Sequence, residues 1–219
     1  MDTYEQVDAA TTLQWFGHAS FILRHEGVTI YIDPWKLPDD VPDADLVLVS
    51  HTHYDHYSAE DIARITGGQT QLIGPKDVIN TAGSGRVVTP GETLTVGTIQ
   101  VTAVPAYNPD KEFHPKNAGW VGFIVELDGK RLYYAGDTGL IEEMNALGEI
   151  DMALLPVGGT YTLDASEAAE AAGRIQPALA VPYHWGDIVG DRGDAETFAE
   201  LCPCEVRIMG PGQTIALDE

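Results

Sequence analysis

The sequence is short of cysteine and has no long apolar run. Its two cysteines, Cys202 and Cys204, flank Pro203. Such a pair is too small for a disulfide framework and is weak evidence for a metal site, so we expect plain thiols in a reducing compartment. No apolar run reaches the roughly 18 residues of a transmembrane helix. The opening "MDTYEQVDAATT" is acidic and polar, whereas a secretory signal is basic and then apolar. We therefore expect a cytoplasmic protein without a membrane partner.

Positive charge is scarce as well. The chain has 12 basic against 34 acidic residues, a net charge of −22. Because the acidic residues are scattered rather than collected in a tail, they indicate a strongly solvated surface, as in a halophilic protein that works in concentrated salt. Such a surface repels nucleic-acid phosphates in dilute buffer, but molar salt screens this repulsion. Charge therefore makes a nucleic-acid partner less favoured without excluding one.

The length and apolar content fit one domain. With 219 residues, of which 44% are apolar, the chain can bury a sizeable core, so we assign residues 1–219 to a single domain. Runs of β-branched and aromatic residues predict strands, the first of them over residues 12–16, 20–25, 28–33 and 45–50. Periodicity and capping signals predict helices over residues 58–66, 75–82, 139–147, 165–175 and 194–201. Both halves mix strands with helices, which favours a four-layer α/β fold with two packed sheets inside and helices outside.

Metal-ligand residue types are concentrated in "HTHYDH", residues 51–56, directly behind the apolar run "DLVLVS". Ser58 and Asp61 have the spacing of a capping box, which places these six residues on a loop between a strand and a helix. On an extended loop, His51 and His53 project to the same side.

Asp55 and His56 follow at a turn, so four donor side chains can converge on one small space. Imidazole and carboxylate are ligands that zinc, manganese and iron share. Crowded imidazoles without a metal would leave buried polar atoms unsatisfied. The motif therefore predicts a metal site rather than a polar surface loop.

The motif resembles the metal-binding signature of the metallo-β-lactamase superfamily, whose fold is an αββα sandwich of two mixed sheets. "WFGHASFIL" and "IYIDPW" resemble the opening of the branch around the ascorbate-6-phosphate lactonases and related metal-dependent hydrolases. "YYAGDTG", "LLPVGGTYTLDASEAA" and "VPYHWGD" match the later motifs of that branch in order. The resemblance covers nearly the whole chain and implies a metal-dependent hydrolase.

The resemblance implies two metal sites that share one bridging carboxylate. It makes His51 and His53 ligands of one metal, Asp55, His56 and His184 ligands of the other, and Asp137 the bridge. Taken alone, Asp137 would be a turn residue and His184 a core histidine. Asp33 resembles the carboxylate that orients a ligating imidazole; the alternative is a turn cap before Pro34.

The sequence departs from the family pattern at one position. Tyr107 and Asn108 stand where the family generally has a further histidine. We expect His114 to reach back and complete the first site, because a neutral amide is a poor zinc ligand. Otherwise the first metal is loosely held and the enzyme works with one ion. His18 is not expected to be a ligand; it has a hydrogen-bonding role at the pocket or is a buried structural histidine.

The implied chemistry is hydrolysis of a small molecule, a lactone, ester or phosphodiester, by a metal-activated water. One or two zinc ions, or Mn²⁺ or Fe²⁺, would lower the pKa of water from 15.7 towards about 7. Asp55 is expected to take part in proton transfer. Tyr107, Tyr161 and Thr162 are either substrate contacts at the pocket rim or simple loop residues.

Two other functions compete with this one. The superfamily includes nucleases for RNA and DNA, but this chain has no basic, glycine-rich arm and no room for an inserted nuclease domain. The missing histidine also allows a metal- or ligand-binding protein without turnover. The sequence leaves the substrate and a homo-oligomeric state open.

Overall fold

Two seven-stranded sheets form the middle of the structure, a computed structural model that describes residues 11–217. The strands of the first sheet, in spatial order, are β14 (Thr214–Ala216), β1 (Thr12–Gly17), β2 (Ser20–His25), β3 (Val28–Ile32), β4 (Ala44–Leu48), β5 (Thr66–Gly74) and β6 (Arg86–Val87). Those of the second are β13 (Glu205–Val206), β12 (Leu179–Tyr183), β11 (Met152–Pro156), β10 (Lys130–Tyr134), β9 (Val121–Leu127), β8 (Ile99–Pro105) and β7 (Thr93–Val96). Each sheet joins antiparallel strands on one side to parallel strands on the other.

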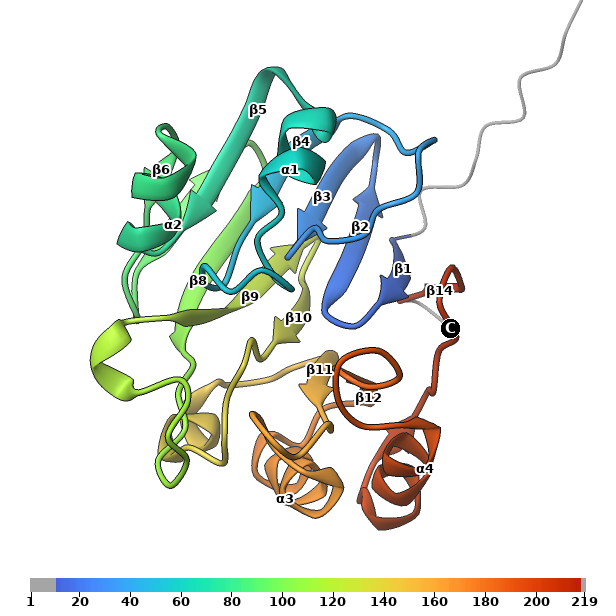
Figure 1. Ribbon diagram of the computed structural model, residues 1–219. Helices are drawn as coiled ribbons and strands as arrows, with labels where there is room; N and C mark the ends of the chain where they lie inside the picture. Colours follow the sequence, from blue (N-terminus) through green and yellow to red (C-terminus); the bar gives the residue numbers. More distant parts are fainter. Residues whose placement is uncertain (1–10, 218–219) are drawn as a thin grey trace, which may run out of the picture.

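Helices cover both outer faces. Figure 1 shows α1 (Ala59–Ile65) and α2 (Lys76–Ala82) against the first sheet, and α3 (Ala165–Ile175) and α4 (Arg192–Leu201) against the second. The predicted four-layer sandwich of two mixed sheets is thereby confirmed. No helix within the described residues is long and apolar enough to cross a bilayer.

The alternation of side chains along a strand explains the layers. In β2, Phe21 and Leu23 belong to the central core between the sheets, whereas Ile22 packs in a smaller cluster on the other face. That smaller cluster includes Ile62 of α1 and Val78 of α2. Because successive side chains of a strand point to opposite faces, an apolar run buries both faces of the sheet.

Two of the predicted helices differ from the observed ones. Residues 139–147 form only a short 3₁₀ helix, Glu142–Ala146, instead of an α-helix. The Gly139 N–H donates to the carbonyl of Tyr107, and Gly148 has a positive φ of 75°, so too few residues remain for a stable α-helix. The last helix begins at Arg192 rather than 194, because Asp191 caps it through a capping box with Asp194.

One edge of the sandwich gathers the ends of many strands. β3 and β4 run parallel with Ile32 opposite Leu48, so the residues that follow them leave the sheet side by side. The two sheets are joined at this edge by backbone hydrogen bonds, from His184 N to His18 O at 3.0 Å and from Val121 N to Ser50 O at 3.3 Å. Side chains beyond the carboxyl ends of parallel strands are thus brought to one place, as in other α/β proteins with ligand sites.

Candidate metal centre

The "HTHYDH" motif forms a turn between β4 and α1, as predicted. The N–H groups of His56 and Tyr57 both donate to the carbonyl of His53, at 3.0 and 2.9 Å, which folds the loop back on itself. Ser58 then caps α1 by accepting a hydrogen bond from Asp61 N. The turn aims the side chains of the motif at the gap between the two sheets.

The first group of donor atoms belongs to His51, His53, His114 and Asp137, which lie within 4.8 Å of one another. His53 Nδ1 lies 3.0 Å from His51 Nε2 and 3.2 Å from His114 Nε2. His114 Nε2 also lies 3.2 Å from Asp137 Oδ2. The expected return of His114 to this group is thus present in the structure, and its role as a ligand stays a prediction.

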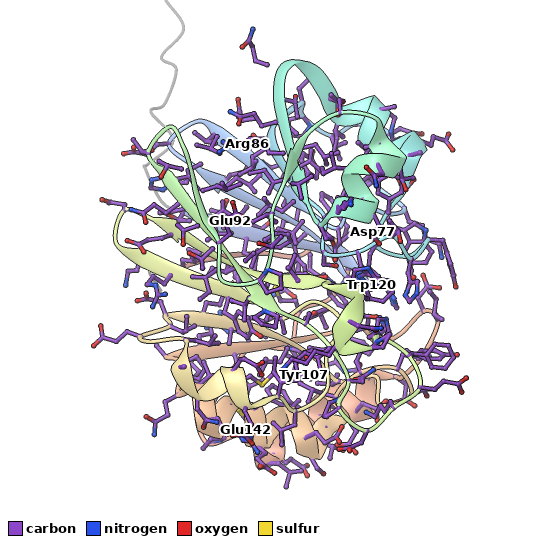
Figure 2. The ribbon with its side chains drawn as sticks, turned by 90° about the vertical axis from the view of Figure 1, so that its left-hand side faces the viewer. Asp77, Arg86, Glu92, Tyr107, Trp120 and Glu142 are labelled. Atoms are coloured by element: carbon purple, nitrogen blue, oxygen red, sulfur yellow. The ribbon has the colours of Figure 1, made fainter. Side chains whose placement is uncertain are left out.

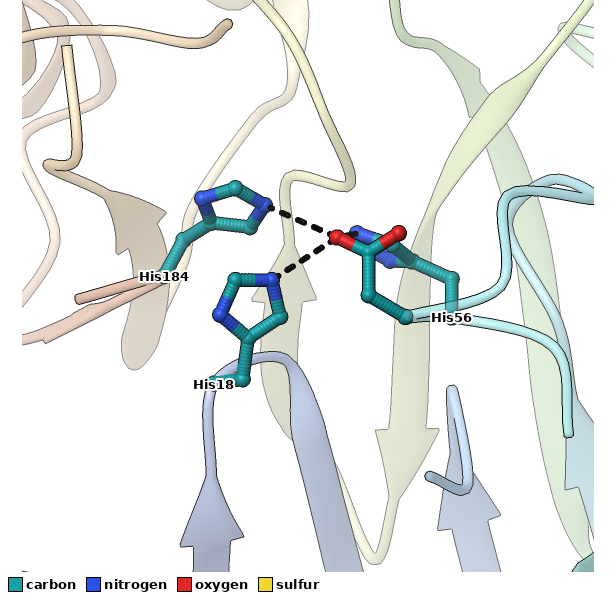
Figure 3. A group of neighbouring side chains, drawn as sticks. His18, His56 and His184 are labelled. Atoms are coloured by element: carbon teal, nitrogen blue, oxygen red, sulfur yellow. Dashed lines mark hydrogen bonds and ion pairs between the residues drawn. The ribbon is translucent and has the colours of Figure 1, made fainter. Parts of the chain in front are cut away.

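The second group consists of His18, Asp55, His56 and His184, again with donor atoms within 4.8 Å. Asp55 Oδ2 lies 3.7 Å from His56 Nε2 and 3.9 Å from His184 Nε2. His18 Nε2 is closer, at 2.9 Å, which fits the expected hydrogen-bonding role. Figure 3 shows the labelled histidines approaching one point from three separate segments of the chain.

Asp137 lies between the two groups. Its Oδ1 is 3.2 Å from His56 Nε2, and its Oδ2 is 3.3 Å from His184 Nε2 in addition to the contact with His114. The carboxylate is buried, at 4% exposure. This is the place that a carboxylate bridging two cations would occupy, although the bridging role itself remains a prediction.

Asp33 fixes the orientation of His56 from below. Its Oδ2 accepts hydrogen bonds from His56 Nδ1 at 2.6 Å and from the hydroxyls of Ser50 and Tyr134, both at 2.5 Å. Its Oδ1 accepts from Ser50 N at 2.7 Å. The hydrogen bond at Nδ1 leaves Nε2 of His56 facing the cluster. Asp33 therefore has the orienting contacts that the resemblance implies and not those of a turn cap.

The backbone around the cluster is held in an uncommon conformation. Among residues 11–217, eight residues other than glycine have a positive φ, and four of them, His18, Asp33, His114 and His184, belong to the site. Residues with a Cβ adopt this conformation only where the surroundings enforce it. The fold therefore holds these donor groups in place instead of leaving them on mobile loops.

Charge coupling sets the protonation states of the cluster. Burial raises the pKa of Asp137, but the imidazoles of His184 and His56 outweigh it and hold that pKa well below its ordinary value. Burial and the neighbouring His56 lower the pKa of His51. Burial also lowers the pKa of His56, yet the carboxylates of Asp137 and Asp33 prevail and raise it well above the ordinary value.

Several buried metal-ligand atoms of the cluster lie close to one another but lack a hydrogen bond of good geometry among residues 11–217. They include His56 Nε2, His184 Nε2 and Asp137 Oδ1. Unpaired buried polar atoms are costly and rare in folded proteins. A divalent cation is a suitable partner for imidazole nitrogen and carboxylate oxygen. The residues of the cluster therefore fit a metal ion.

Asn108, at the position of the missing family histidine, holds the loop that carries His114. Its Nδ2 donates to the carbonyls of Phe113 at 2.8 Å and Tyr161 at 2.7 Å, and its backbone N–H donates to His114 O at 2.8 Å. His114 Nδ1 lies 3.1 Å from Tyr161 O, which leaves Nε2 facing the cluster. Asn108 thus positions His114.

Two residues that the sequence suggested as rim contacts point elsewhere. The Tyr107 hydroxyl donates to Glu143 Oε2 at 3.0 Å, and Thr162 is completely buried with its hydroxyl on the carbonyl of Leu163. Neither of them lines the pocket over the cluster, whereas Tyr161 does. The protein partners of their hydroxyls favour the alternative that Tyr107 and Thr162 are simple loop residues.

Two residues that support the cluster, Trp120 and Asp77, were not predicted from the sequence. The ring of Trp120 packs against the imidazoles of His51, His53 and His114, with centroids 4.8, 4.9 and 5.5 Å apart. Its Nε1 donates to Asp77 Oδ2 at 2.8 Å, and Figure 2 shows the two labelled side chains near each other. No spacing in the sequence links the first turn of α2 with the start of β9, so this support could not be found from the sequence.

A pocket of about 240 Å³ opens above the cluster. Its lining residues are His53, Tyr54, Asp55, Phe113, His114, Asp137, Tyr161, His184 and Ile188. His51 and His56 are buried beneath it, at 1% and 0% exposure. Donor atoms from both groups therefore face a space that a small molecule can enter.

Comparison with known proteins identifies the family. A family model described as a β-lactamase superfamily domain matches residues 12–184. A UPF0173 metal-dependent hydrolase from Methanopyrus kandleri is 35% identical over 92% of this chain and 98% of its own. The chain belongs to the metallo-β-lactamase superfamily and to its UPF0173 family. The comparisons do not place this UPF0173 protein in the ascorbate-6-phosphate lactonase branch.

Solved structures agree with the fold of this UPF0173 family member. A metallo hydrolase from the archaeon Ignicoccus hospitalis is 30% identical, with a TM-score of 0.78 over 94% of this chain and 98% of that one. A Parabacteroides distasonis protein is 33% identical, with a TM-score of 0.84 over 90% of this chain and 92% of that one. The protein is thus a metal-dependent hydrolase with the metallo-β-lactamase fold.

Replacement of His114 by alanine should remove roughly one bound ion per chain, because the first group would keep only two imidazoles beside the shared carboxylate. Metal content after purification without chelator, measured by plasma mass spectrometry, checks this. An unchanged metal content in folded His114→Ala would exclude His114 as a ligand.

Asn108→Ala should also lower occupancy of the first group, because it frees the carbonyls of Phe113 and Tyr161 and with them the loop of His114. Tyr107→Phe is the matched control, since its hydroxyl contacts Glu143 and lies outside the pocket lining. In metal titrations, Asn108→Ala should bind the ion of the first group about tenfold more weakly than Tyr107→Phe. Equal affinities would show that Asn108 does not position His114.

The chelated protein should be most stable near pH 6.5. The pKa values of His18, His51 and His53 are lowered in the folded state, so the unfolded chain takes up more protons as pH falls below about 6.5. The raised pKa of His56 contributes stability that is lost as pH rises through the folded value. Urea unfolding from pH 5 to 9 measures this maximum.

The metal-loaded protein is the control for this pH profile. A cation replaces the proton on His56, so the decline above neutral pH should disappear when metal is added back. A chelated protein whose free energy of unfolding rises steadily to pH 9 would contradict the charge state assigned to His56.

Proposed function

We propose that the protein hydrolyses a small molecule with one or two zinc ions held by the two donor groups. The observation that carries this is the buried Asp137 carboxylate between two sets of imidazoles at the floor of a pocket. Imidazole and carboxylate favour zinc, and manganese and iron accept the same ligands. Residues 1–219 would work as one catalytic domain.

The residues would share the work in a defined way. His51, His53 and His114 would hold one ion, Asp55, His56 and His184 the other, and Asp137 would contact both. A bound divalent cation supplies hydroxide at neutral pH and polarises the bond to be cleaved. Asp33 and Trp120 support the ligands from the protein side.

Asp55 is the group placed for proton transfer. It lines the pocket, and its Oδ2 is engaged by His18 Nε2 at 2.9 Å. Burial raises the pKa of Asp55, but the hydrogen bond from His18 outweighs it, so the carboxylate is ionised at neutral pH. It can take a proton at Oδ1 while His18 keeps the side chain oriented.

A small-molecule substrate fits the pocket better than a nucleic acid. The pocket of about 240 Å³ is smaller than most ligand sites, which suits a small molecule, and no lysine or arginine lines it within residues 11–217. Binding of RNA or DNA depends on such cations. The return of His114 to the first group also weakens the case for a binding protein without turnover. The resemblance of its sequence motifs to those of the lactonase branch puts lactones among the first substrates to test.

The acidic composition supports a protein that works in concentrated salt inside the cell. A net charge of −22 creates strong self-repulsion, which molar salt screens. Assays therefore belong in molar potassium chloride as well as in dilute buffer.

His53→Ala should remove the ion of the first group and lower kcat/KM at least about 100-fold, because His53 lies at the centre of that group. His25→Ala is the control. His25 is the one of seven histidines outside the cluster, and its Nδ1 contacts the hydroxyl of Thr11. Hydrolysis of a lactone and ester panel, together with metal analysis, measures the effect. Full activity in metal-free His53→Ala would overturn the proposal.

A further inference from the structure

Exposed apolar side chains are concentrated at the pocket mouth. The described residues have four exposed large hydrophobic side chains, and two of them, Tyr54 at 66% and Phe113 at 47% exposure, line the pocket. Tyr161 and Ile188 complete the rim. Exposed apolar surface costs solvation free energy, and where it is gathered at a pocket it marks a binding surface.

The rim is held in place before any ligand arrives. The ring of Phe113 meets Tyr161 edge to face, with centroids 4.9 Å apart, and Asn108 donates to the carbonyls of both residues. Tyr54, which also lines the pocket, packs on Trp35, with centroids 6.0 Å apart. Because the aromatic surfaces are already ordered, an apolar ligand loses little free energy to ordering them.

Within the part of the chain that the structure describes, the loops around the pocket offer no unpaired lysine to an anionic ligand. Three lysines lie on these loops, and each is paired: Lys36 with Asp187 at 2.7 Å, Lys111 with Glu167 at 3.1 Å and Lys116 with Glu143 at 3.0 Å. None of the three lines the pocket. Phosphate and carboxylate ligands are normally recognised by arginine or lysine, so the rim selects against them.

We propose that the substrate is an uncharged carboxylic ester or lactone with an apolar, ring-sized substituent that lies between Tyr54 and the Phe113–Tyr161 pair. This rests on the hydrolytic function proposed above and narrows its substrate class. A polar carbonyl would reach the cluster at the floor while the substituent stays at the rim. The proposal sets aside phosphodiesters and phosphorylated lactones.

The reaction consumes one water molecule and needs no oxidant or reductant. The oxygen of water bonds to the carbonyl carbon, and the bond from that carbon to the alkoxy oxygen breaks. Asp55 takes one proton from water and passes it to the alkoxy oxygen, so the first products are a carboxylic acid and an alcohol, joined in one hydroxy acid if the substrate is a lactone. The acid then releases its remaining proton to solvent and leaves as a carboxylate.

Three compounds test this substrate class with the metal-loaded full chain in molar potassium chloride. They are γ-phenyl-γ-butyrolactone, the same lactone with a carboxylate in place of the phenyl ring, and bis(p-nitrophenyl) phosphate. The phenyl lactone should exceed both anions in kcat/KM by about tenfold or more. Binding of the matching phenyl and carboxylate lactams, measured by calorimetry, gives the same comparison without turnover.

Variants test whether the aromatic residues at the pocket mouth cause the preference for the phenyl compound. Phe113→Ala should reduce the discrimination between phenyl and carboxylate lactams about fivefold or more, and Phe113→Lys should reverse it. Leu201→Ala, which removes another exposed apolar side chain but lies on α4 outside the pocket, should leave it unchanged.

The outcomes separate the two proposals. If the phenyl lactam binds preferentially but no compound is hydrolysed, the hydrolytic function fails and the ligand class holds. If an anionic compound binds or reacts as well as the neutral one, or if no lactam binds, the ligand class is overturned whatever the hydrolysis of other substrates shows.

Discussion

The buried contact between Asp137 and the imidazoles around it is the constraint on which the site depends. One carboxylate touches His56, His114 and His184, which come from three distant parts of the chain. A buried anion is costly unless it is paired, so the cluster is stable only when imidazolium or a cation compensates its charge. The cluster therefore needs both sheets to be held together beside it, and main-chain hydrogen bonds join the sheets at that edge of the sandwich.

Support for the cluster comes from residues that do not face the pocket. Asp33 orients His56, Asn108 fixes the loop of His114, and Trp120 covers the imidazoles of the first group from the side of α2. Such outer contacts determine which nitrogen of each imidazole is free. The pocket above then needs few polar groups of its own, and its mouth is aromatic and without free positive charge. Metal-ligand side chains at the bottom of the pocket and aromatic side chains at its mouth are what a hydrolase of neutral molecules needs.

Much of this could be predicted from the sequence, because strong local patterns carry it. The strands and the capped helices follow from periodicity and capping residues, and "HTHYDH" predicts its own loop. The prediction of an α-helix over residues 139–147 was wrong, because the chain forms only a short 3₁₀ helix there. The start of this helix depends on a loop contact between Gly139 and Tyr107. The contacts of Trp120 with the histidines and of Asn108 with two carbonyls join segments far apart in sequence. Only the folded chain reveals them.

Anomalous X-ray scattering from crystals grown with zinc tests the central claim most directly. Two peaks on either side of the Asp137 carboxylate, one touching Nε2 of His114 and the other Nε2 of His56 and His184, are the result expected from the buried donor atoms. A protein that shows no peak beside Asp137, or binds its zinc elsewhere, would contradict the assignment of this cluster as the metal centre.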